Sequence, residues 1–560
     1  MKLTGAEIIV RTLIEQGVTD VFGYPGGQII NVYDALYKYR DEINHTLTAH
    51  EQGAAHAADG YSRATGKVGV CIATSGPGAT NLVTGIATAM LDSIPLVAIT
   101  GNVPCSLIGK DSFQEIDITG ITLPITKHNY FVNKVEELAD SIREAFSIAK
   151  SGRPGPVLID VPKDVQMATC EYEPKEISPK IPLPLAKDDA IAAAVELINE
   201  SKRPYIYIGG GAAGLGMGEE IVEFAEKIDA YIGCTFMGLS AIPDRLSERF
   251  LGMQGMHGHY ASSVSQNEAD LIIGIGVRFS DRATGNVKKY AKGGKIIQLD
   301  PDFSEINKNV KVDCGIVGDV EYSFKAIAKA VAAKKNPEWT ARIAELKADE
   351  KKLEAEAESG VAFTPRKVFD VINEKKPLGT VIATDVGQHQ MWTAQYVNFD
   401  RTRRFVSSGG LGTMGFGLGA AIGARVATGD TTVLITGDGS FGMNLNELAT
   451  AVAYNIPVII VLMNNGVLGM VRQWQTLFFG GRYSNTVLSD RKTDFVKLAE
   501  AFGAVGMRAS TEAEFSDAFA KALTLNRPVV IDTIIDKDEF VLPMLPPGGS
   551  VDEIITNVKK

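Results

Sequence analysis

Short apolar runs rich in valine and isoleucine alternate with helix-length segments along all 560 residues of the chain. Most of these runs are bounded by Gly, Pro or Asp, which is typical of buried strands in parallel sheets. Parallel neighbours need a crossover connection, usually a helix, so the alternation predicts an α/β fold with right-handed crossovers. The predicted strands are 68–73, 96–100, 157–161, 205–208, 271–275, 295–299, 381–384, 432–436, 458–463 and 529–533.

Two breaks in this pattern predict three doubly wound parallel-sheet domains. Residues 162–187 contain many prolines, which indicates an extended linker. Residues 333–360 are dense in Lys, Glu and Ala, which predicts an exposed helix that leads out of a domain. We therefore place the domains at residues 1–165, 188–335 and 365–545. The linker prolines are Pro162, Pro174, Pro179, Pro182 and Pro184.

Charge and cysteine content exclude several classes of function. The net charge of −11 argues against a general binder of nucleic acids or anionic membranes. The five cysteines are scattered without a CxxC pair, so we expect a reducing cytoplasm and no zinc site. No apolar run approaches the ~20 residues of a membrane helix, and Glu7, Arg11 and Glu15 interrupt any signal-peptide core.

The first and third predicted domains share a pattern of strand, glycine turn, helix, Ile-Pro and strand. Gly76 precedes Pro95 by 19 residues, and Gly437 precedes Pro457 by 20. We interpret the two domains as products of an ancient duplication. The alternative, that any strand–helix–strand unit looks alike, stays open.

A glycine turn at residues 437–440 predicts an anion and metal site. Gly437-Asp438-Gly439-Ser440 follows a predicted strand and opens a helix, where backbone N–H groups favour phosphate. Asn465 follows the next strand, 27 residues after Asp438. Neighbouring parallel strands end at the same sheet edge, so the two side chains can converge. Carboxylate, amide, carbonyl and phosphate oxygens would suit octahedral Mg²⁺.

This combination resembles the thiamine-diphosphate-dependent enzymes, which carry Gly-Asp-Gly followed by Asn-Asn. The resemblance implies that Asp438, the Asn465 side chain and the Val467 carbonyl hold Mg²⁺, which clamps the diphosphate. Gly437, Gly439 and Ser440 would contact the diphosphate itself.

The same resemblance implies two residues that act on the cofactor rings. Ala49-His50-Glu51-Gln52-Gly53 matches the element whose glutamate hydrogen-bonds the aminopyrimidine across a subunit interface. A protonated Glu51 would donate to N1′ and favour the imino tautomer, which takes the thiazolium C2 proton. The glycine-rich segment 409–415 matches the element with an apolar wedge between the rings, which makes Met414 the wedge.

Over essentially its whole length the chain resembles the catalytic subunit of the acetolactate synthases, also called acetohydroxyacid synthases. The segments 23–27, 107–115, 276–282 and 464–474 carry this resemblance. It implies a transferase that decarboxylates pyruvate and condenses the hydroxyethyl carbanion with a second 2-keto acid. Pyruvate would give 2-acetolactate and 2-ketobutyrate would give 2-aceto-2-hydroxybutyrate, the first common step of valine, leucine and isoleucine biosynthesis.

The resemblance also implies the substrate contacts. Gly27 would lie near the reacting carbon, and Phe113 and Gln114 near the cofactor. Arg282 would hold the carboxylate of the second acid, which a guanidinium fork matches. Trp474 would pack against the extra methyl group of 2-ketobutyrate.

A further glycine-rich turn, 209–214, has GxGxxG spacing after a predicted strand, which alone is a weak signal. The acidic residue expected after the next strand is absent, because Asp229 precedes that strand, so an ordinary NAD site is doubtful. The resemblance implies FAD with a structural role, since the net reaction is not a redox one. The matching positions are Arg153, Gly209, Gly210, Gly211, Thr235, Met256, His257, Gly258, Gly276, Arg278, Arg282, Asp300 and Asp319.

The resemblance implies a homodimer or homotetramer with active sites between chains, and a possible small regulatory subunit. Alternatives are a catabolic acetolactate synthase without flavin, a pyruvate oxidase that uses flavin for redox, and a non-enzymatic relative. Glyoxylate carboligase-like chemistry is disfavoured, because that relative is expected to lack the glutamate at position 51.

Overall fold

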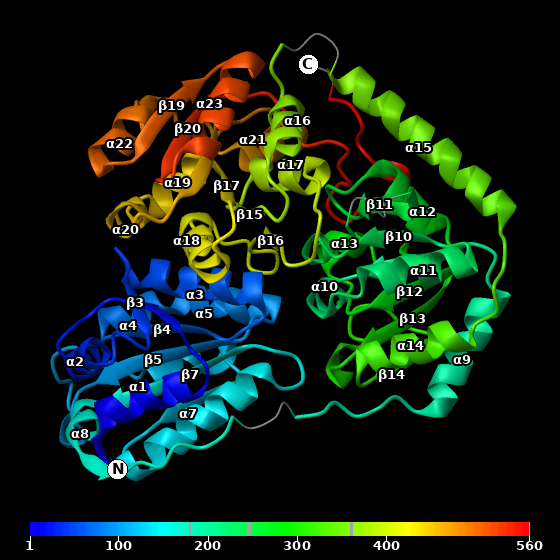
Figure 1. The fold of residues 1–560 in the computed structure, drawn as a ribbon. Coiled ribbons are helices and arrows are strands. Elements are labelled where there is room, and N and C mark those ends of the chain that lie inside the picture. Colours follow the sequence, from blue (N-terminus) through cyan, green and yellow to red (C-terminus); the bar gives the residue numbers. More distant parts are fainter. Residues whose placement is uncertain (178–180, 244–247, 359–361, 559–560) are drawn as a thin grey trace.

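Three six-stranded sheets, each parallel throughout, form the framework of the computed structural model, which describes residues 1–177, 181–243, 248–358 and 362–558 (Figure 1). Helices flank each sheet, so the prediction of three doubly wound α/β domains is confirmed. All ten predicted strands are present. No helix within the described ranges is both long and apolar enough to cross a bilayer.

The first and third sheets have the same strand order. The first runs β3-β2-β4-β5-β7-β6 and the third β16-β15-β17-β18-β20-β19, so both read second, first, third, fourth, sixth, fifth along the chain. This shared order supports the interpretation of a duplication. The strands are β2 (Asp20–Gly23), β3 (Asn44–Leu47), β4 (Gly69–Ala73), β5 (Leu96–Asn102), β6 (His128–Phe131), β7 (Pro156–Pro162), β15 (Val381–Thr384), β16 (Phe405–Val406), β17 (Thr432–Gly437), β18 (Val458–Asn464), β19 (Val505–Ala509) and β20 (Val529–Ile534).

The middle sheet has a different order, β11-β10-β9-β12-β13-β14, in which the direction of winding reverses between β9 and β12. Ligands of open α/β sheets bind at the carboxyl ends of the strands at such a reversal. The strands are β9 (Pro204–Ile208), β10 (Tyr231–Cys234), β11 (Phe250–Met253), β12 (Leu271–Ile275), β13 (Lys295–Asp300) and β14 (Cys314–Val317).

The helices begin with local signals that the sequence carries. Thr4 and Glu7 form a capping box at the start of α1, whose apolar side is buried. The first domain contains α1 (Gly5–Glu15), α2 (Ile30–Lys38), α3 (Glu51–Thr65), α4 (Pro77–Asn81), α5 (Val83–Asp92), α6 (Ile118–Thr122), α7 (Val135–Lys150) and α8 (Lys163–Met167). The middle domain contains α9 (Asp188–Glu200), α10 (Gly210–Leu215), α11 (Gly218–Ile228), α12 (Tyr260–Glu268), α13 (Asp281–Thr284) and α14 (Val320–Ala330), followed by α15 (Pro337–Glu358). The third domain contains α16 (Pro365–Lys375), α17 (Gln388–Tyr396), α18 (Gly417–Thr428), α19 (Asp438–Asn444), α20 (Glu447–Ala453), α21 (Gly469–Phe478), α22 (Phe495–Phe502) and α23 (Glu512–Thr524).

Helices α3 and α18 join the first and third domains at very close range (Figure 1). A Cβ on Gly423 would lie 1.8 Å from the carbonyl oxygen of Ala57, and one on Gly60 would lie 2.1 Å from that of Ala420. Both positions therefore need glycine, because the two backbones touch. This contact fixes the orientation of the two domains within one chain.

The segments between the domains differ in detail from the predictions. The first domain continues past residue 165, because β8 (Thr169–Glu171) pairs antiparallel with β1 (Lys2–Thr4). Residues 178–180 of the predicted linker, Pro179 among them, lie outside the described residues. The predicted helix at 333–360 forms as α15, but it packs on the middle domain, with the Trp339 side chain fully buried. Residues 359 and 360 lie outside the described part.

The chain returns to the middle domain after β20, along the red segment of Figure 1. The Leu545 N–H donates to the carbonyl of Met256 at 2.7 Å, and the Asn286 N–H donates to that of Gly549 at 3.0 Å. The C-terminal segment thus ties the third domain to the middle one.

Candidate active site

A cleft lies at the carboxyl ends of β15, β17 and β18. It contains all six of the residues that the resemblance assigned to the diphosphate and metal, together with Met414. The lining residues are Val386, Gly387, Gln388, His389, Trp392, Met414, Gly437, Asp438, Gly439, Ser440, Met463, Asn465, Val467, Leu468, Gly469, Met470 and Val471.

Asp438 and Asn465 converge in this cleft, as the strand ends predicted. Burial raises the pKa of the Asp438 carboxyl to about 6. A nearby cation would offset that penalty. The Asn465 Oδ1 atom accepts from the Val467 N–H at 3.2 Å, so the amide oxygen and the residue whose carbonyl is the third implied ligand lie together. This oxygen-only donor set fits a hard cation such as Mg²⁺.

Glycines keep the floor of the cleft open. A Cβ on Gly437 would lie 2.9 Å from the His389 Nδ1 atom, and one on Gly439 would lie 2.6 Å from the Leu468 side chain. Ser440, in the first turn of α19, donates to the Val386 carbonyl at 3.1 Å. Helix α19 thus begins at the floor of the cleft, and the N-terminus of a helix suits a phosphate.

His389 also lines the cleft, and the sequence analysis did not single it out. Its Nε2 atom is buried and has no hydrogen-bond partner within the described structure. Burial lowers the pKa of the imidazole to about 3, so it is neutral at physiological pH. An orphaned polar atom on a residue that lines the cleft fits a bound polar ligand. A sequence signal for this residue was available, since Gly387-Gln388-His389 begins three residues after the end of the predicted strand 381–384.

Glu51 lies outside this cleft. It opens α3 of the first domain, and its carboxylate accepts from the Asn81 amide at 3.0 Å. All residues that line the cleft within the described chain belong to the third domain. One chain therefore does not bring Glu51 and Asp438 into a single pocket.

The other first-domain candidates lie on loops that do not line the cleft. The Lys163 ammonium donates to the Gly27 carbonyl at 3.0 Å, which fixes that turn. Gln114 adopts a left-handed backbone with φ of 61°, and its Cα lies 3.0 Å from where a Cβ on Gly76 would be. Phe113 is 84% exposed, unusual for so large an apolar side chain.

The two substrate candidates lie in different domains, Arg282 on α13 of the middle domain and Trp474 on α21 of the third. The Arg282 side chain is 65% exposed, and its guanidinium lies 3.8 Å from the Asp281 carboxylate. Burial and, secondarily, this arginine lower the pKa of His257 to about 4. Trp474 is half-buried on α21, edge-on to Phe478 with ring centroids 5.7 Å apart.

Glycines crowd the reversal point of the middle sheet, where the flavin positions were predicted. A Cβ on Gly209 would lie 2.0 Å from the Gly276 carbonyl oxygen, and one on Gly211 would lie 2.9 Å from the Gly276 Cα. Two strand-to-loop turns thus touch at the carboxyl ends of β9 and β12, the position at which this type of sheet binds ligands.

Charged residues from two domains gather at the same sheet edge. Arg153 of the first domain binds Glu305 at 2.6 Å, and Arg278 lies near both. Burial and nearby acids raise the pKa of Asp300 to about 6. Two arginines beside a glycine turn fit an anionic nucleotide.

The remaining flavin candidates have local structural contacts. Thr235 caps the turn at Phe236–Gly238, and Asp319 caps α14 by accepting from the Tyr322 N–H at 2.9 Å. Met256 donates its N–H to the Arg282 carbonyl at 2.8 Å, and a Cβ on Gly258 would clash with Gln254. The His257 Nδ1 atom is buried without a partner in the described structure. Asp229, whose position before the strand makes an ordinary NAD site doubtful, pairs with Arg249 at 2.8 Å.

Comparison with known families agrees with this architecture domain by domain. The N-terminal TPP binding domain of thiamine pyrophosphate enzymes matches residues 3–121, the central domain 191–327, and the C-terminal TPP binding domain 385–533. The three sheets and the cleft thus define a thiamine-pyrophosphate-dependent enzyme.

Curated relatives match along the whole chain. A probable acetolactate synthase large subunit of Methanocaldococcus jannaschii is 45% identical over 100% of this chain and 96% of its own length. The isozyme 3 large subunit of Escherichia coli acetolactate synthase is 42% identical over 99% and 98%. The acetolactate synthase large subunit of Corynebacterium glutamicum is 45% identical over 99% and 90%. The chain belongs to the acetolactate synthase large-subunit family.

Proposed function

We propose that this chain catalyses the synthesis of 2-acetolactate from two pyruvates and of 2-aceto-2-hydroxybutyrate from pyruvate and 2-ketobutyrate. The convergence of Met414, Asp438 and Asn465 in one cleft carries the proposal. Membership of the acetolactate synthase family supports it over other thiamine-diphosphate chemistry.

In this proposal Asp438, the Asn465 amide oxygen and the Val467 carbonyl hold Mg²⁺. The open floor at Gly437 and Gly439 admits the diphosphate, and the neutral His389 imidazole offers it a hydrogen bond. Thiamine diphosphate, when bound, supplies a carbanion and an electron sink for decarboxylation.

Glu51 serves as the acid–base group, and it acts in the cleft of a second copy. The cleft of a single chain is lined by the third domain alone, within the described residues. We therefore propose a homodimer or homotetramer in which the first domain of one copy completes the site of another. A small regulatory subunit is a further possible partner.

Arg282 binds the carboxylate of the second keto acid, since its guanidinium is exposed and weakly paired. Trp474 contacts the extra methyl group of 2-ketobutyrate. Gly27 and Gln114, on first-domain loops, approach the reacting carbon from the partner copy. In the assembled site, Arg282, Trp474, Gly27 and Gln114 surround one substrate.

FAD occupies the reversal point of the middle sheet in this proposal. Gly209, Gly211 and Gly276 form the close turns there, and Arg153 and Arg278 face the anionic part. Its role is structural, because the net reaction transfers no electrons to an acceptor. The five unpaired cysteines agree with a reducing cytoplasm, which is the proposed location.

The decisive experiment supplies Mg²⁺, thiamine diphosphate, FAD and equal pyruvate and 2-ketobutyrate, and quantifies both acetohydroxy acids. We expect both products, with acetohydroxybutyrate dominant. Asp438→Asn should abolish both, whereas Asp517→Asn, the same change on the exposed side of α23, should abolish neither.

Each alternative predicts a different outcome of this experiment. Acetolactate alone, formed without added FAD, would indicate the catabolic enzyme. Pyruvate consumption that rises with an added electron acceptor would indicate an oxidase. Pyruvate loss without either acetohydroxy acid would overturn the proposal.

A further inference from the structure

The loop at residues 407–416, between β16 and α18, carries Met414 into the cleft, and carboxylates hold its backbone on both sides. The Gly415 and Gly417 N–H groups donate to Asp385 Oδ1 at 2.8 and 3.1 Å. The Gly409 and Gly410 N–H groups donate to Asp92 at 3.0 and 2.7 Å. Asp385 belongs to the same domain as the loop, but Asp92 does not.

Asp92 is the last residue of α5 in the first domain, and its side chain is fully buried. The contact with the loop is tight. A Cβ on Gly410 would lie 2.9 Å from both Asp92 Oδ1 and the Leu91 Cβ, so glycine is required there. A second contact from α5 lies nearby, since the Thr88 and Thr413 hydroxyl groups are 2.7 Å apart. The first domain thus holds the loop at two points.

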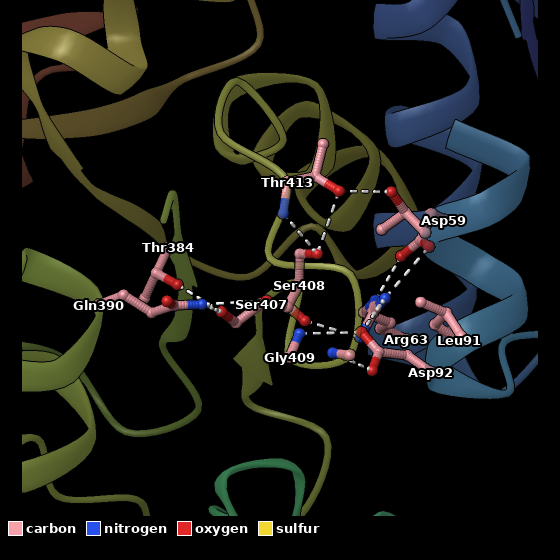
Figure 2. A network of polar contacts seen from close by, with 12 residues as sticks. Asp59, Arg63, Leu91, Asp92, Thr384, Gln390, Ser407, Ser408, Gly409 and Thr413 are labelled. Carbon is pink, nitrogen blue, oxygen red and sulfur yellow. Dashed lines mark hydrogen bonds and ion pairs between the residues drawn. The ribbon is translucent and has the colours of Figure 1, made fainter. Parts of the chain in front are cut away.

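Arg63 of α3 connects Asp92 to the start of the loop (Figure 2). Its guanidinium binds Asp92 at 3.0 Å, the Ser407 carbonyl at 2.7 Å and Asp59 through two nitrogens. Its side chain is 3% exposed, and both carboxylates are fully buried. Figure 2 shows Asp59, Arg63 and Asp92 on one side of the loop, with Thr384 and Gln390 bonded to Ser407 on the other side.

Two buried carboxylates around one buried arginine are a costly way to stabilise a fold. The desolvation of such a group can exceed its Coulombic gain, and apolar side chains of the same volume often stabilise as well. What the group supplies here is a fixed position for the loop. Three hydrogen bonds join Arg63 and Asp92 to the loop backbone, at Ser407, Gly409 and Gly410, and a fourth joins Arg63 to Asp92. The middle domain also contributes, since Arg278 donates to the Leu91 carbonyl at 2.6 Å.

We propose that Asp92 and Arg63 are positioning residues for the cofactor site, which set Met414 by fixing the loop from the first domain of the same chain. The inference rests on the proposed role of Met414 beside thiamine diphosphate. Helix α3 then has two roles. Its first residue, Glu51, acts in the cleft of a second copy, and its last turns support Met414 in the cleft of its own chain.

The test replaces Asp92 by Asn. The amide offers one oxygen to three donors, and an NH₂ group at the Oδ1 position would face the Gly410 N–H. We expect the rate of C2 proton–deuterium exchange of bound thiamine diphosphate, followed by NMR, to fall at least about tenfold, because a hydrogen bond to a charged group is lost and the loop shifts. Glu15→Gln is the matched control. It breaks another buried pair of the first domain, with Arg143 at 2.7 Å, that touches no part of the loop.

A milder variant covers the possibility that Asp92→Asn does not fold. Thr88→Val keeps the shape of the side chain and removes the hydroxyl that meets Thr413, so it should slow the same exchange about threefold. Exchange in both variants at the rate of the Glu15→Gln control would overturn the inference.

Binding to the unaltered protein separates this inference from the proposed function. Trp392 lines the cleft, so titration of thiamine diphosphate with Mg²⁺ should change the tryptophan fluorescence. Failure of the unaltered protein to bind thiamine diphosphate would contradict the proposed function. If the unaltered protein binds thiamine diphosphate but the C2 exchange rate in the variants equals that of the control, only the positioning role of Asp92 and Arg63 is contradicted.

Discussion

The Glu447 carboxylate, in the third domain, accepts the backbone N–H of His50, the residue directly before Glu51, at 3.0 Å. The same carboxylate accepts the Ala49 N–H at 3.1 Å and the Thr450 hydroxyl at 2.6 Å. It is fully buried, and burial raises its pKa. The start of α3 is thus anchored to the neighbouring domain.

Replacement Glu447→Gln should loosen this anchor. The amide NH₂ group would face one of the two backbone N–H groups, which costs about 1–3 kcal/mol for the unpaired donor. Hydrogen exchange at Ala49 and His50, followed by mass spectrometry, should accelerate. Glu321→Gln, at an exposed carboxylate paired with Lys325, is the control and should change nothing there. Unchanged protection in Glu447→Gln would show that the anchor is dispensable.

Replacement Glu51→Gln should leave the affinity for thiamine diphosphate largely intact and reduce turnover by about 10²- to 10⁴-fold, the range of general acid–base catalysis. Calorimetric titration and initial rates measure the two quantities. Glu500→Gln, an exposed position on α22, provides the matched control. Near-normal turnover of Glu51→Gln would remove this residue from the mechanism.

Replacement Trp474→Leu should lower the preference for 2-ketobutyrate over pyruvate. One methylene in an apolar pocket is worth about 1–3 kcal/mol, so the ratio of the two products under competition should fall about tenfold. The ring of Phe478 packs against Trp474 one turn later, and Phe478→Leu tests whether any loss of aromatic surface on α21 has this effect. A product ratio unchanged in Trp474→Leu would refute the specificity role.

Acid should weaken the fold partly through His56, which lies between α3 and α18 with its ring 5.2 Å from that of Phe416. Burial, and then Arg63, lower the pKa of His56 to about 3, against about 6.5 in an unfolded chain. The stabilisation from the neutral ring is therefore complete above pH 6.5 and is lost as pH falls towards 3. Relative to His56→Gln, the native protein should lose about 1.4 kcal/mol per pH unit below pH 6.5.

Thermal unfolding of the two proteins between pH 7.5 and pH 5 measures this difference, and other titrating groups cancel because both proteins contain them. His128→Gln, at an exposed histidine, is the matched control substitution. A stability difference between the native protein and His56→Gln that does not change with pH would contradict the assignment.

Ten of the twelve interior strands were predicted from sequence, but the interior strands β2 and β10 and all the edge strands were not. The ten predicted strands are continuous apolar runs, because interior parallel strands are covered on both faces. Strands such as β6 (His128–Phe131) and β16 (Phe405–Val406) are short and lie at edges, where one side needs no apolar partner. The motif spacing placed Asp438 and Asn465 correctly. Each residue lies at the end of a predicted strand, and neighbouring parallel strands end at the same edge of the sheet. Contacts between distant segments, such as Asp92 with Gly409, left no local pattern, and His389 gave only a weak one.

Helices α3 and α18 hold the same place in two sheets of the same strand order, each preceding the third strand of its sheet. Under the duplication interpretation, two identical domains that met through this helix would make the same backbone contact about a twofold axis. The contact then preserves the geometry of an ancestral homodimer within one polypeptide. In a fused chain the two halves need not stay identical. One half could then specialise in binding the phosphate end of a ligand and the other in binding its ring. The glycines at the contact between α3 and α18 are what remains of their common descent.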